Sequence, residues 1–235
     1  MKTLGLIGGM SWESTAVYYR LMNEEVKLRL GGFHSAQILL ASMDFAPLEA
    51  WQRSGDWDAA GEALANCALT LEAAGAQAIM LCTNTMHRVA STIEAAIGIP
   101  LLHIADAATA PIINAGHRRV LLLGTRYTME QPFLRERLER GGLNLLIPSH
   151  AERECVNRII YDQLCQGQVT QASRAAFLEI IDGHAANAGA QAVLLACTEI
   201  GMLVDSSDVS IPVYDSTVLH VQFGMNFAFE NRPER

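Results

Sequence analysis

The sequence predicts an α/β protein made of two similar halves, each with a parallel β-sheet. Two observations support this class. Along the 235 residues, short apolar runs alternate with longer stretches of helical periodicity. Such strand–helix alternation is typical of parallel sheets covered by helices on both faces. In addition, short segments of the first half of the chain recur in the same order in the second half.

The expected strands are short runs of apolar residues, a pattern that favours buried strands. These runs are residues 4–7, 36–41, 78–82, 101–102, 120–123, 145–147, 193–196 and 212–214. In parallel sheets, ligands bind outside the carboxyl ends of the strands. The polar residues that directly follow these runs are therefore the first candidates for a functional site.

Two helices carry clear signals. One is expected over residues 14–30, because apolar residues recur every three or four positions. Its expected buried face consists of Tyr18, Leu21, Met22 and Val26. The other is expected from Thr128 to Arg140, just before two glycines. Here Thr128 is the expected N-cap and Gln131 occupies the capping-box position.

The repeat within the chain is weak but collinear. Three matches at nearly constant offset indicate two similar α/β halves joined near residues 105–118. Residues 75–81 (GAQAIML) recur as 189–195 (GAQAVLL), 4–8 (LGLIG) as 120–124 (VLLLG), and 98–102 (GIPLL) as 210–214 (SIPVY).

The repeat predicts two domains. The first comprises residues 1–108 plus 215–235, because the C-terminal tail is expected to return to the first half; the second comprises residues 109–214. Duplicated α/β domains often bind their ligand in the cleft between them, so we expect the active site there.

Charge and composition exclude several functions. The net charge is −8 without a basic run, which argues against nucleic acid or an anionic membrane as partner. No apolar run reaches the eighteen or so residues that span a bilayer, and the N-terminus lacks the pattern of a signal peptide. These features favour a cytoplasmic protein.

The cysteines and lysines bear on cofactors. Five cysteines show no CxxC or other metal-ligand spacing, so we expect reduced thiols and no metal. Only Lys2 and Lys27 could form a Schiff base, and neither follows a strand end or a glycine turn, which argues against pyridoxal phosphate. A GxxxxGK[ST] loop for phosphates is also missing, and no cofactor is expected.

The stretch LCTNTMH (residues 81–87) raises the question of which side chain reacts. Extending the second-half match without a gap places Thr83 opposite Cys197, whereas Cys82 falls opposite Ala196 inside the strand. Successive strand residues point to opposite faces, so Cys82 and Thr83 cannot both face the cleft. The symmetric pair is Thr83 and Cys197, and Cys82 is interpreted as structural.

Two acid/base groups that face each other across a pseudo-twofold cleft suit racemisation or epimerisation without a cofactor. One group removes a proton from carbon, and the other returns a proton to the opposite face. The thiol of Cys197 suits the first role. Residues 197–199 lead into a helical pattern, whose backbone N–H groups could lower the thiol pKa and bind a carboxylate.

Several segments resemble the aspartate/glutamate racemase family over nearly the whole chain. They are LGLIGGMSWEST, CTNTMH, LLGTRYTME, GAQAVLLACTEIGML and IPVYDSTVLH. The resemblance implies two Rossmann-like domains, often a homodimer, and racemisation of a small amino-acid substrate without cofactor or metal.

The family resemblance also assigns roles at the two motifs. The usual first motif is Cys-Asn-Thr, and here Thr83 occupies the position of that cysteine. The second motif, Cys197-Thr198-Glu199, matches in full. The resemblance therefore implies that Cys197 deprotonates an L-enantiomer, most simply L-aspartate or L-glutamate, and that the Thr83 hydroxyl reprotonates the other face. Because a hydroxyl is a far weaker acid than a thiol, L-substrates should be favoured.

The resemblance further implies residues that bind the substrate. The carboxylate-holding positions are Met10, Ser11, Asn84, Thr85, Thr198 and Glu199, with Thr125 and Thr128 at the equivalent strand end of the other half. For the substrate side chain, the family's arginine position is matched by Gln52 or Arg53. Its lysine region reads LCQG (residues 164–167) without a positive charge, which leaves a broader amino-acid range open.

Other interpretations remain open. A hydantoin racemase, a maleate isomerase or an arylmalonate decarboxylase would use similar cleft cysteines, and an amino-acid-binding protein without activity is a third class. Thr83 could simply cap a helix, and His87 could either orient the site or fill the core. Glu199 could polarise Cys197, bind the substrate ammonium or cap a helix.

Overall fold

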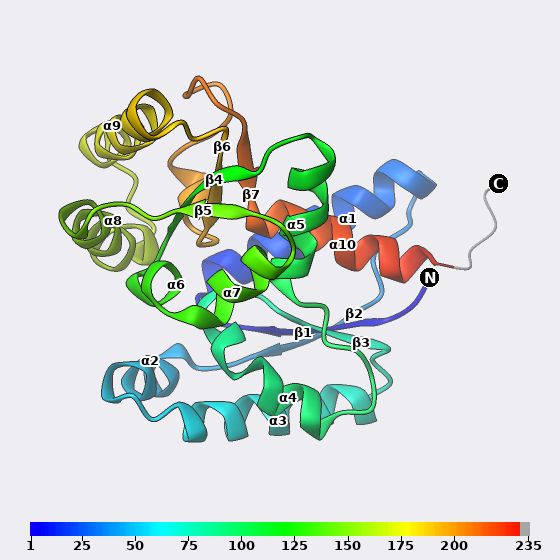
Figure 1. The fold of residues 1–235 in the computed structure, drawn as a ribbon. Coiled ribbons are helices and arrows are strands. Elements are labelled where there is room, and N and C mark those ends of the chain that lie inside the picture. Colours follow the sequence, from blue (N-terminus) through cyan, green and yellow to red (C-terminus); the bar gives the residue numbers. More distant parts are fainter. Residues whose placement is uncertain (231–235) are drawn as a thin grey trace. The chain divides into compact units, whose positions relative to one another are not determined.

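The computed structural model describes residues 1–230, and the chain forms two compact units (Figure 1). Unit 1 comprises Met1–His103 together with the described residues from His220 on, and unit 2 comprises Ile104–Leu219. The predicted division, 1–108 plus 215–235 against 109–214, stays a prediction about domains; the compact units change over at 103/104 and at 219/220.

Unit 1 contains a three-stranded parallel sheet in the order β2-β1-β3. Its strands are β1 (Leu4–Gly8), β2 (Ile38–Ser42) and β3 (Ala78–Leu81). Its helices are α1 (Trp12–Leu30), α2 (Phe45–Ser54), α3 (Trp57–Ala73), the 3-10 helix η1 (Thr85–Val89), α4 (Ala90–Ala96) and most of α10 (Ser216–Phe229).

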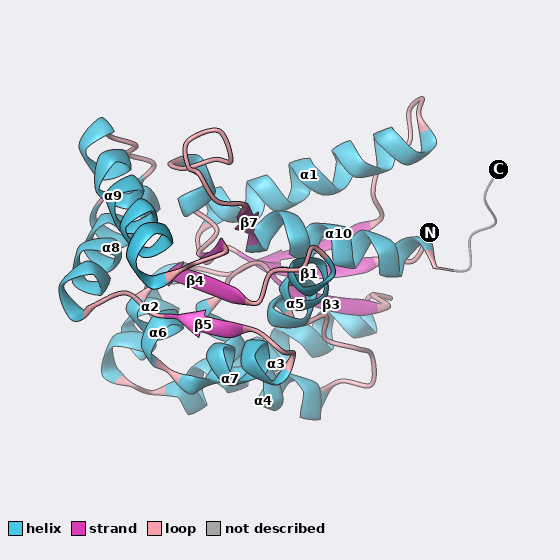
Figure 2. Ribbon diagram, turned by 45° about the horizontal axis from the view of Figure 1, so that its top comes forward, coloured by secondary structure: helices cyan, strands magenta, loops and turns pink. Residues whose placement is uncertain are grey.

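Unit 2 contains a four-stranded parallel sheet in the order β5-β4-β6-β7. Its strands are β4 (Arg119–Gly124), β5 (Asn144–Leu146), β6 (Ala192–Ala196) and β7 (Val213–Asp215). The helices are α5 (Ile104–Asn114), α6 (Arg126–Glu130), α7 (Pro132–Arg140), α8 (His150–Asp162) and α9 (Gln171–Ala188), with 3-10 helices η2 (Leu164–Gln166) and η3 (Ile200–Met202). Helices α8 and α9 lie side by side (Figure 2).

The central strands of both sheets are buried on both faces, as the alternation of apolar runs and helices predicts. In β1, Leu4 and Leu6 belong to the core with α1 and α10, whereas Ile7 belongs to the core on the other face with α3. In β4, Leu121 and Leu123 pack on the α8–α9 side, and alternate residues pack on the α5–α7 side. This alternation explains why the strands read as continuous apolar runs. The predicted α/β class with two parallel sheets is confirmed.

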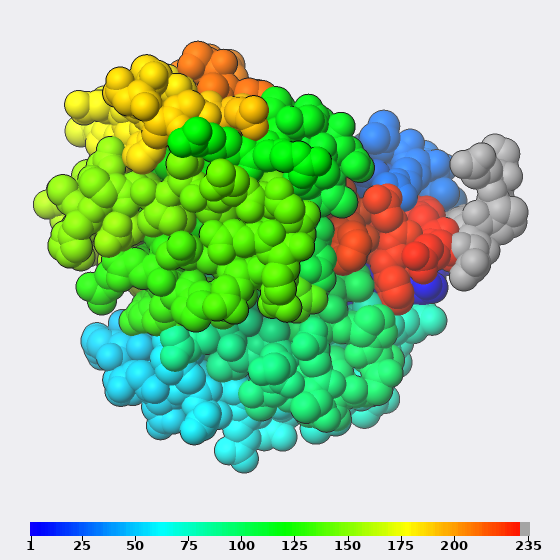
Figure 3. Space-filling model, in the orientation of Figure 1, coloured from blue at the N-terminus to red at the C-terminus, as the bar shows by residue number. Residues whose placement is uncertain are grey.

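The C-terminal helix α10 lies against the N-terminal segment in unit 1. The backbone N–H of Lys2 donates to the carbonyl of Ala228 (2.8 Å), and the Arg29 guanidinium donates to the Asn226 side chain (2.7 Å). Figure 3 shows this helix in red beside the blue N-terminal residues. Helix α10 therefore packs with the first half of the chain, while residues 231–235 of the expected tail lie outside the described residues.

Three local predictions were wrong. The expected helix over residues 128–140 is two helices, because Pro132 lacks an N–H and begins a new helix, α7. The expected N-cap, Thr128, was also wrong: the N-cap of α6 is Thr125, whose side chain accepts from the N–H of Thr128. The expected strand at 101–102 is only an isolated bridge between Leu101 and Ile79. The junction expected near residues 105–118 stays a prediction; this segment is largely the helix α5.

No described helix combines the length and the apolar character that crossing a membrane would require.

Candidate active site

The strand registers place Thr83 and Cys197 at equivalent positions of their own units. In unit 1, Ile7 of the central strand pairs with Leu81, and in unit 2, Leu123 pairs with Leu195. These pairs follow the same repeat that the sequence shows. Thr83 lies two residues beyond Leu81, and Cys197 lies two residues beyond Leu195, so each residue follows the strand next to its central strand.

The turn after β1 is closely packed and positions Met10 and Ser11. Gly9 has φ +88° and its N–H donates to the Thr15 hydroxyl (2.8 Å). A Cβ at Gly9 would collide with the carbonyl oxygen of Met43, so both the positive φ and the close approach require glycine. Ser11 is the N-cap of α1, and both Met10 and Ser11 are buried.

Cys82 lies in the core of unit 1. Its side chain is fully buried in the apolar cluster that α1 and α10 form with the sheet, and burial raises the pKa of this thiol far above its usual range. Its N–H donates to the carbonyl of Ile7 (2.9 Å), and its carbonyl accepts from the Ser14 hydroxyl (3.1 Å). Cys82 therefore continues the strand and carries a protonated, packed thiol.

Thr83, Asn84 and Thr85 form the turn that leads into η1, and all three are buried. The N-cap position of η1 is Asn84, and no side-chain capping bond is made there, so Thr83 is not the cap of this helix. The Thr83 carbonyl accepts a hydrogen bond from Nδ1 of His87 (2.8 Å).

Two further buried histidines lie near His87. The ring centroid of His103 is 4.4 Å from that of His87, and the centroid of His220 is 5.8 Å away. All three rings are at most 2% exposed. His103 follows the predicted strand at 101–102 and His220 ends the IPVYDSTVLH block, yet sequence reasoning weighed only His87. For His103 the position after an apolar run was the available signal, and for His220 it was its place in the IPVYDSTVLH block.

Of the two candidates on α2 for side-chain recognition, only one is buried. Gln52 is 4% exposed and its Nε2 donates to the Met86 sulfur (2.9 Å). Arg53 is largely exposed and pairs with Glu49 (3.5 Å) on the helix surface. Gln52 is therefore the buried residue of this pair. It contacts Met86 in η1, the 3-10 helix that follows Thr83.

In unit 2, Cys197, Thr198 and Glu199 form a hydrogen-bonded group at the end of β6. The Cys197 thiol donates to Oε2 of Glu199 (3.0 Å), and the Thr198 hydroxyl donates to the same oxygen (2.7 Å). All three residues are at most 7% exposed. A carboxylate that accepts from a thiol is placed to take its proton, so the geometry favours polarisation of Cys197 as one role of Glu199.

The electrostatics of Cys197 differ from the sequence prediction. Burial, and next the negative charge of Glu199, raise the pKa of the thiol well above its ordinary value. The expected lowering by a helix N-terminus was wrong, because η3 is a single 3-10 turn of three residues. Such a short element has a weak dipole, and desolvation outweighs it. The resting thiol is protonated.

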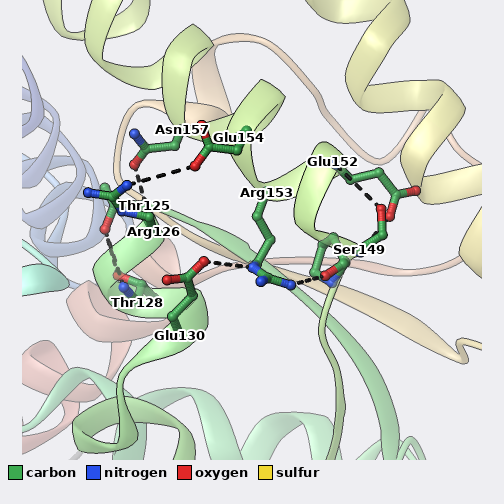
Figure 4. A network of polar contacts seen from close by, with 10 residues as sticks. Thr125, Arg126, Thr128, Glu130, Ser149, Glu152, Arg153, Glu154 and Asn157 are labelled. Atoms are coloured by element: carbon green, nitrogen blue, oxygen red, sulfur yellow. Dashed lines mark hydrogen bonds and ion pairs between the residues drawn. The ribbon is translucent and has the colours of Figure 1, made fainter.

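Thr125 and Thr128 lie at the end of β4, where α6 begins (Figure 4). Their hydroxyl oxygens are 3.1 Å apart, and both residues are buried. The N–H of Arg126 donates to the Asn157 side chain (2.8 Å), which ties this turn to α8. A second tie joins Arg153 of α8 to Glu130 of α6 (2.8 Å). Unit 2 thus holds the two threonines on a turn that is fixed at both ends.

Cofactor and metal candidates are few. Lys2 pairs with Glu230 (2.8 Å) and lies over the ring of Phe227, so it stabilises the contact between the chain ends. Among residues 1–230, no group of three or more histidine, cysteine or acidic side chains is arranged to hold a metal ion.

Comparison with known proteins identifies the family. The model of the Asp/Glu/hydantoin racemase family matches residues 7–224. The chain belongs to this family. The resemblance predicted from the CTNTMH and CTEIGML segments is thereby confirmed, as is the prediction of an isomerase of the amino-acid racemase type.

Relatives of the racemase family agree in sequence and fold. A candidate Asp/Glu racemase from Yersinia pestis is 51% identical, covers 98% of this chain and 100% of its own, and superposes with a TM-score of 0.91. An aspartate racemase homologue from Pyrococcus horikoshii OT3 is 33% identical, with coverage of 98% and 100% and a TM-score of 0.87. The broad specificity amino-acid racemase RacX of Bacillus subtilis (strain 168) is 25% identical over 91% of this chain and 92% of RacX.

Proposed function

We propose that this chain racemises amino acids without a cofactor and that L-aspartate and L-glutamate are its preferred substrates. Cys197 removes the α-proton of the L-enantiomer, and the Thr83 hydroxyl returns a proton to the opposite face of the resulting carbanion. The proton gained on the Cys197 side is then released to water, and Thr83 takes a proton from water, which restores the site. The observation that carries the proposal is the hydrogen bond from the Cys197 thiol to Glu199 at the end of β6. It supplies a route by which a protonated thiol becomes a base.

The thiol and Glu199 share one proton and one negative charge. When the proton moves from Cys197 to Glu199 along the 3.0 Å hydrogen bond, the total charge of the pair does not change, and the neutral acid donates back to the thiolate. This transfer avoids the cost of adding a second negative charge to a buried site, which the raised pKa of Cys197 reflects. An arriving substrate ammonium adds positive charge and favours the thiolate further.

Thr83 is the proposed donor on the other face because it holds in unit 1 the position that Cys197 holds in unit 2. A hydroxyl gives up its proton much less readily than a thiol, so this step limits inversion. The two enantiomers have equal free energies in solution, and kcat/KM must therefore be equal in the two directions. The expectation that L-substrates are favoured was thus wrong for kcat/KM. The asymmetry of the site appears instead as α-proton exchange of the L-enantiomer that outpaces its inversion.

The substrate carboxylate is proposed to bind at the buried turns that follow the strands. The residues are Met10 and Ser11 after β1, Asn84 and Thr85 after β3, Thr125 and Thr128 after β4, and Thr198 and Glu199 after β6. Backbone N–H groups and hydroxyls in such turns are suited to an anion because they donate without carrying a charge of their own.

Side-chain preference is the finer part of the proposal. Gln52 is the buried polar residue on α2, and an amide can donate to an acidic side chain or bond to a neutral one. The η2 segment Leu164–Gln166 carries no positive charge. A broad amino-acid range is therefore the alternative, and the likeness to RacX, whose name states broad specificity, favours it. The family description also names hydantoin racemases, so a hydantoin is included in the test below.

Proton exchange in D₂O tests this function. The protein is incubated with L-aspartate, L-glutamate, a panel of neutral amino acids, a hydantoin and maleate, and the α-proton signals and enantiomer ratios are followed by NMR and chiral chromatography. We expect loss of the α-proton signal and formation of D-enantiomer with at least one amino acid. Binding without exchange would support an amino-acid-binding protein instead.

We further propose that the chain is a homodimer in the reducing cytoplasm. All five cysteines are free thiols, which suits that compartment. On α1, Trp12 is 67% exposed and Tyr19 is 54% exposed, and their spacing of seven residues puts both on one face. Aromatic residues of this kind are enriched in interfaces. Analytical ultracentrifugation should give a dimer, and Tyr19→Glu should shift it toward monomer; a monomeric wild type contradicts the proposal.

A further inference from the structure

We propose that His87 is a positioning residue of the racemase site: its hydrogen bond to the Thr83 carbonyl holds the Thr83–Asn84 peptide in the orientation that reprotonation requires. This inference rests on the proposed role of Thr83 as proton donor. It assigns His87, which lies one helical turn further along the chain, a supporting role that requires no contact with the substrate.

The hydrogen bond determines which nitrogen of His87 carries a proton. A carbonyl oxygen can only accept, so Nδ1 of His87, 2.8 Å from the Thr83 oxygen, is the donor. A neutral His87 ring is therefore protonated at Nδ1 and not at Nε2. The side chain is 2% exposed, so water competes little for this bond.

The Thr83–Asn84 peptide links both proposed functions of the turn. It is planar, so an anchor on its carbonyl also fixes the direction of the Asn84 N–H. The same anchor restricts the Cα of Thr83, from which the side chain with the hydroxyl projects. A hydrogen bond to the carbonyl also polarises the peptide and makes its N–H a stronger donor. One contact from His87 thus acts on the proton donor and on a proposed carboxylate-binding N–H.

The local helix offers little support of its own. The turn leads into η1, a 3-10 helix of five residues, whose hydrogen-bond geometry is poorer than that of an α-helix. Its N-cap Asn84 makes no side-chain capping bond. A side-chain anchor from within η1 compensates for this weakness.

The neighbouring histidines hold the His87 ring in place. The Tyr18 hydroxyl donates to Nδ1 of His220 (2.8 Å), and Nε2 of His220 donates to the Leu102 carbonyl (2.7 Å). Burial lowers the pKa of His220 to about 4, so this ring is neutral near pH 7 and does not repel His87. The His220 ring meets the His87 ring edge to face, and the centroid of the His103 ring lies 4.4 Å from that of His87. A fixed ring plane keeps Nδ1 aimed at the carbonyl.

Two variants of His87 separate positioning from packing and from proton transfer. In His87→Asn, the amide nitrogen stands where Nδ1 stood, so the donor is kept while the titratable ring is lost. In His87→Leu, a side chain of similar bulk lacks any donor. Both variants are assayed with L-aspartate in D₂O, and α-proton exchange of the L-enantiomer is measured separately from formation of the D-enantiomer.

We expect His87→Leu to lower kcat for inversion about 10- to 100-fold, because a small misplacement of a reacting group has an effect of that size. Exchange on the Cys197 face should change less than threefold, and KM should change less than kcat. His87→Asn should keep inversion within about threefold of wild type. Cys82→Ala, which alters packing next to Thr83 without touching its carbonyl, is the matched control and should behave as wild type.

A second readout does not depend on activity. In the wild type, ¹⁵N NMR should show His87 protonated at Nδ1, and the Thr83 carbonyl ¹³C shift should move in His87→Leu but not in His87→Asn. An unprotonated Nδ1, or a carbonyl shift that is the same in all three proteins, overturns the positioning role even if the enzyme racemises. Equal inversion in wild type and His87→Leu also overturns it, as does equal loss in both variants, which would indicate proton transfer by the ring.

The two proposals fail in different ways. If the wild type exchanges no α-proton, the proposed function fails, while the carbonyl and ¹⁵N shifts still decide whether His87 anchors the turn. If the wild type racemises and His87→Leu inverts as fast as wild type, only the His87 proposal fails.

Discussion

The Thr83 turn of unit 1 and the Cys197 turn of unit 2 occupy the same place in two similar sheets, yet their surroundings differ. Thr83 is anchored through its backbone by His87, within a group of buried histidines. Cys197 is bonded through its side chain to Glu199, beside an apolar core. In the Thr83 turn, the hydrogen bond restrains the backbone. In the Cys197 turn, the hydrogen bond acts on the proton of the thiol.

This difference shows how a duplicated fold can acquire an asymmetric function. The repeated strands keep the two turns in equivalent registers, because strand pairing depends on the apolar pattern of β1, β3, β4 and β6. The chemistry of each turn depends on a few side chains that follow the strands, and these can change without disturbing the sheet. A thiol with a neighbouring carboxylate suits a base, and a hydroxyl on a rigid turn suits a proton donor.

The largest expected effect is the loss of the base. In Cys197→Ala, both α-proton exchange of L-aspartate and inversion should fall by a factor of at least about 10³, since the proposed base is removed. The measurement is the NMR exchange assay. Exchange that persists in Cys197→Ala would show that Cys197 is not the base.

Removing the proposed proton donor should impair inversion but not proton exchange at Cys197. In Thr83→Ala, inversion should fall about 10²- to 10⁴-fold, whereas exchange of the L-enantiomer at Cys197 should persist. Thr83→Cys should restore inversion and should add rapid α-proton exchange of the D-enantiomer, because a thiol can act as acid and as base. Unchanged inversion in Thr83→Ala would remove Thr83 from the mechanism.

The role of Glu199 predicts opposite changes in activity and thiol reactivity. In Glu199→Gln, the negative charge that opposes a thiolate is absent, so the pKa of Cys197 should fall, although burial keeps it above the usual range. Alkylation of Cys197 by iodoacetamide should then begin at lower pH, while inversion falls about 10- to 100-fold because the proton acceptor is lost. Mass spectrometry locates the label, and Cys197→Ala is the control. An unchanged alkylation profile would contradict the coupling.

The smallest effect is expected at Cys82. Cys82→Ala should leave exchange and inversion within about twofold of wild type and should lower the free energy of unfolding by about 1 kcal/mol, the usual scale for a small loss of core volume. Urea denaturation and the NMR assay together test this. A large loss of activity without a loss of stability would assign Cys82 a direct role.

Much of this protein follows from local patterns in its sequence. Apolar runs and helical periodicity predicted two parallel sheets covered on both faces, and the repeat of GAQAIML as GAQAVLL placed Thr83 opposite Cys197. These inferences held because strand register follows from which residues are apolar. The prediction of one continuous helix over residues 128–140 was wrong because Pro132, which has no backbone N–H, ends one helix and begins the next.

Other properties arose only in the folded chain. The state of Cys197 depends on how much water its neighbours exclude and on where the Glu199 carboxylate points, and neither is encoded in the spacing of the motif. The contact of His87 with His103 and His220 joins three separate segments of the sequence. The order of apolar runs and polar turns is enough to predict which residues stand at the strand ends. Tertiary packing decided their protonation and orientation, because desolvation and hydrogen-bond geometry are properties of the assembled core.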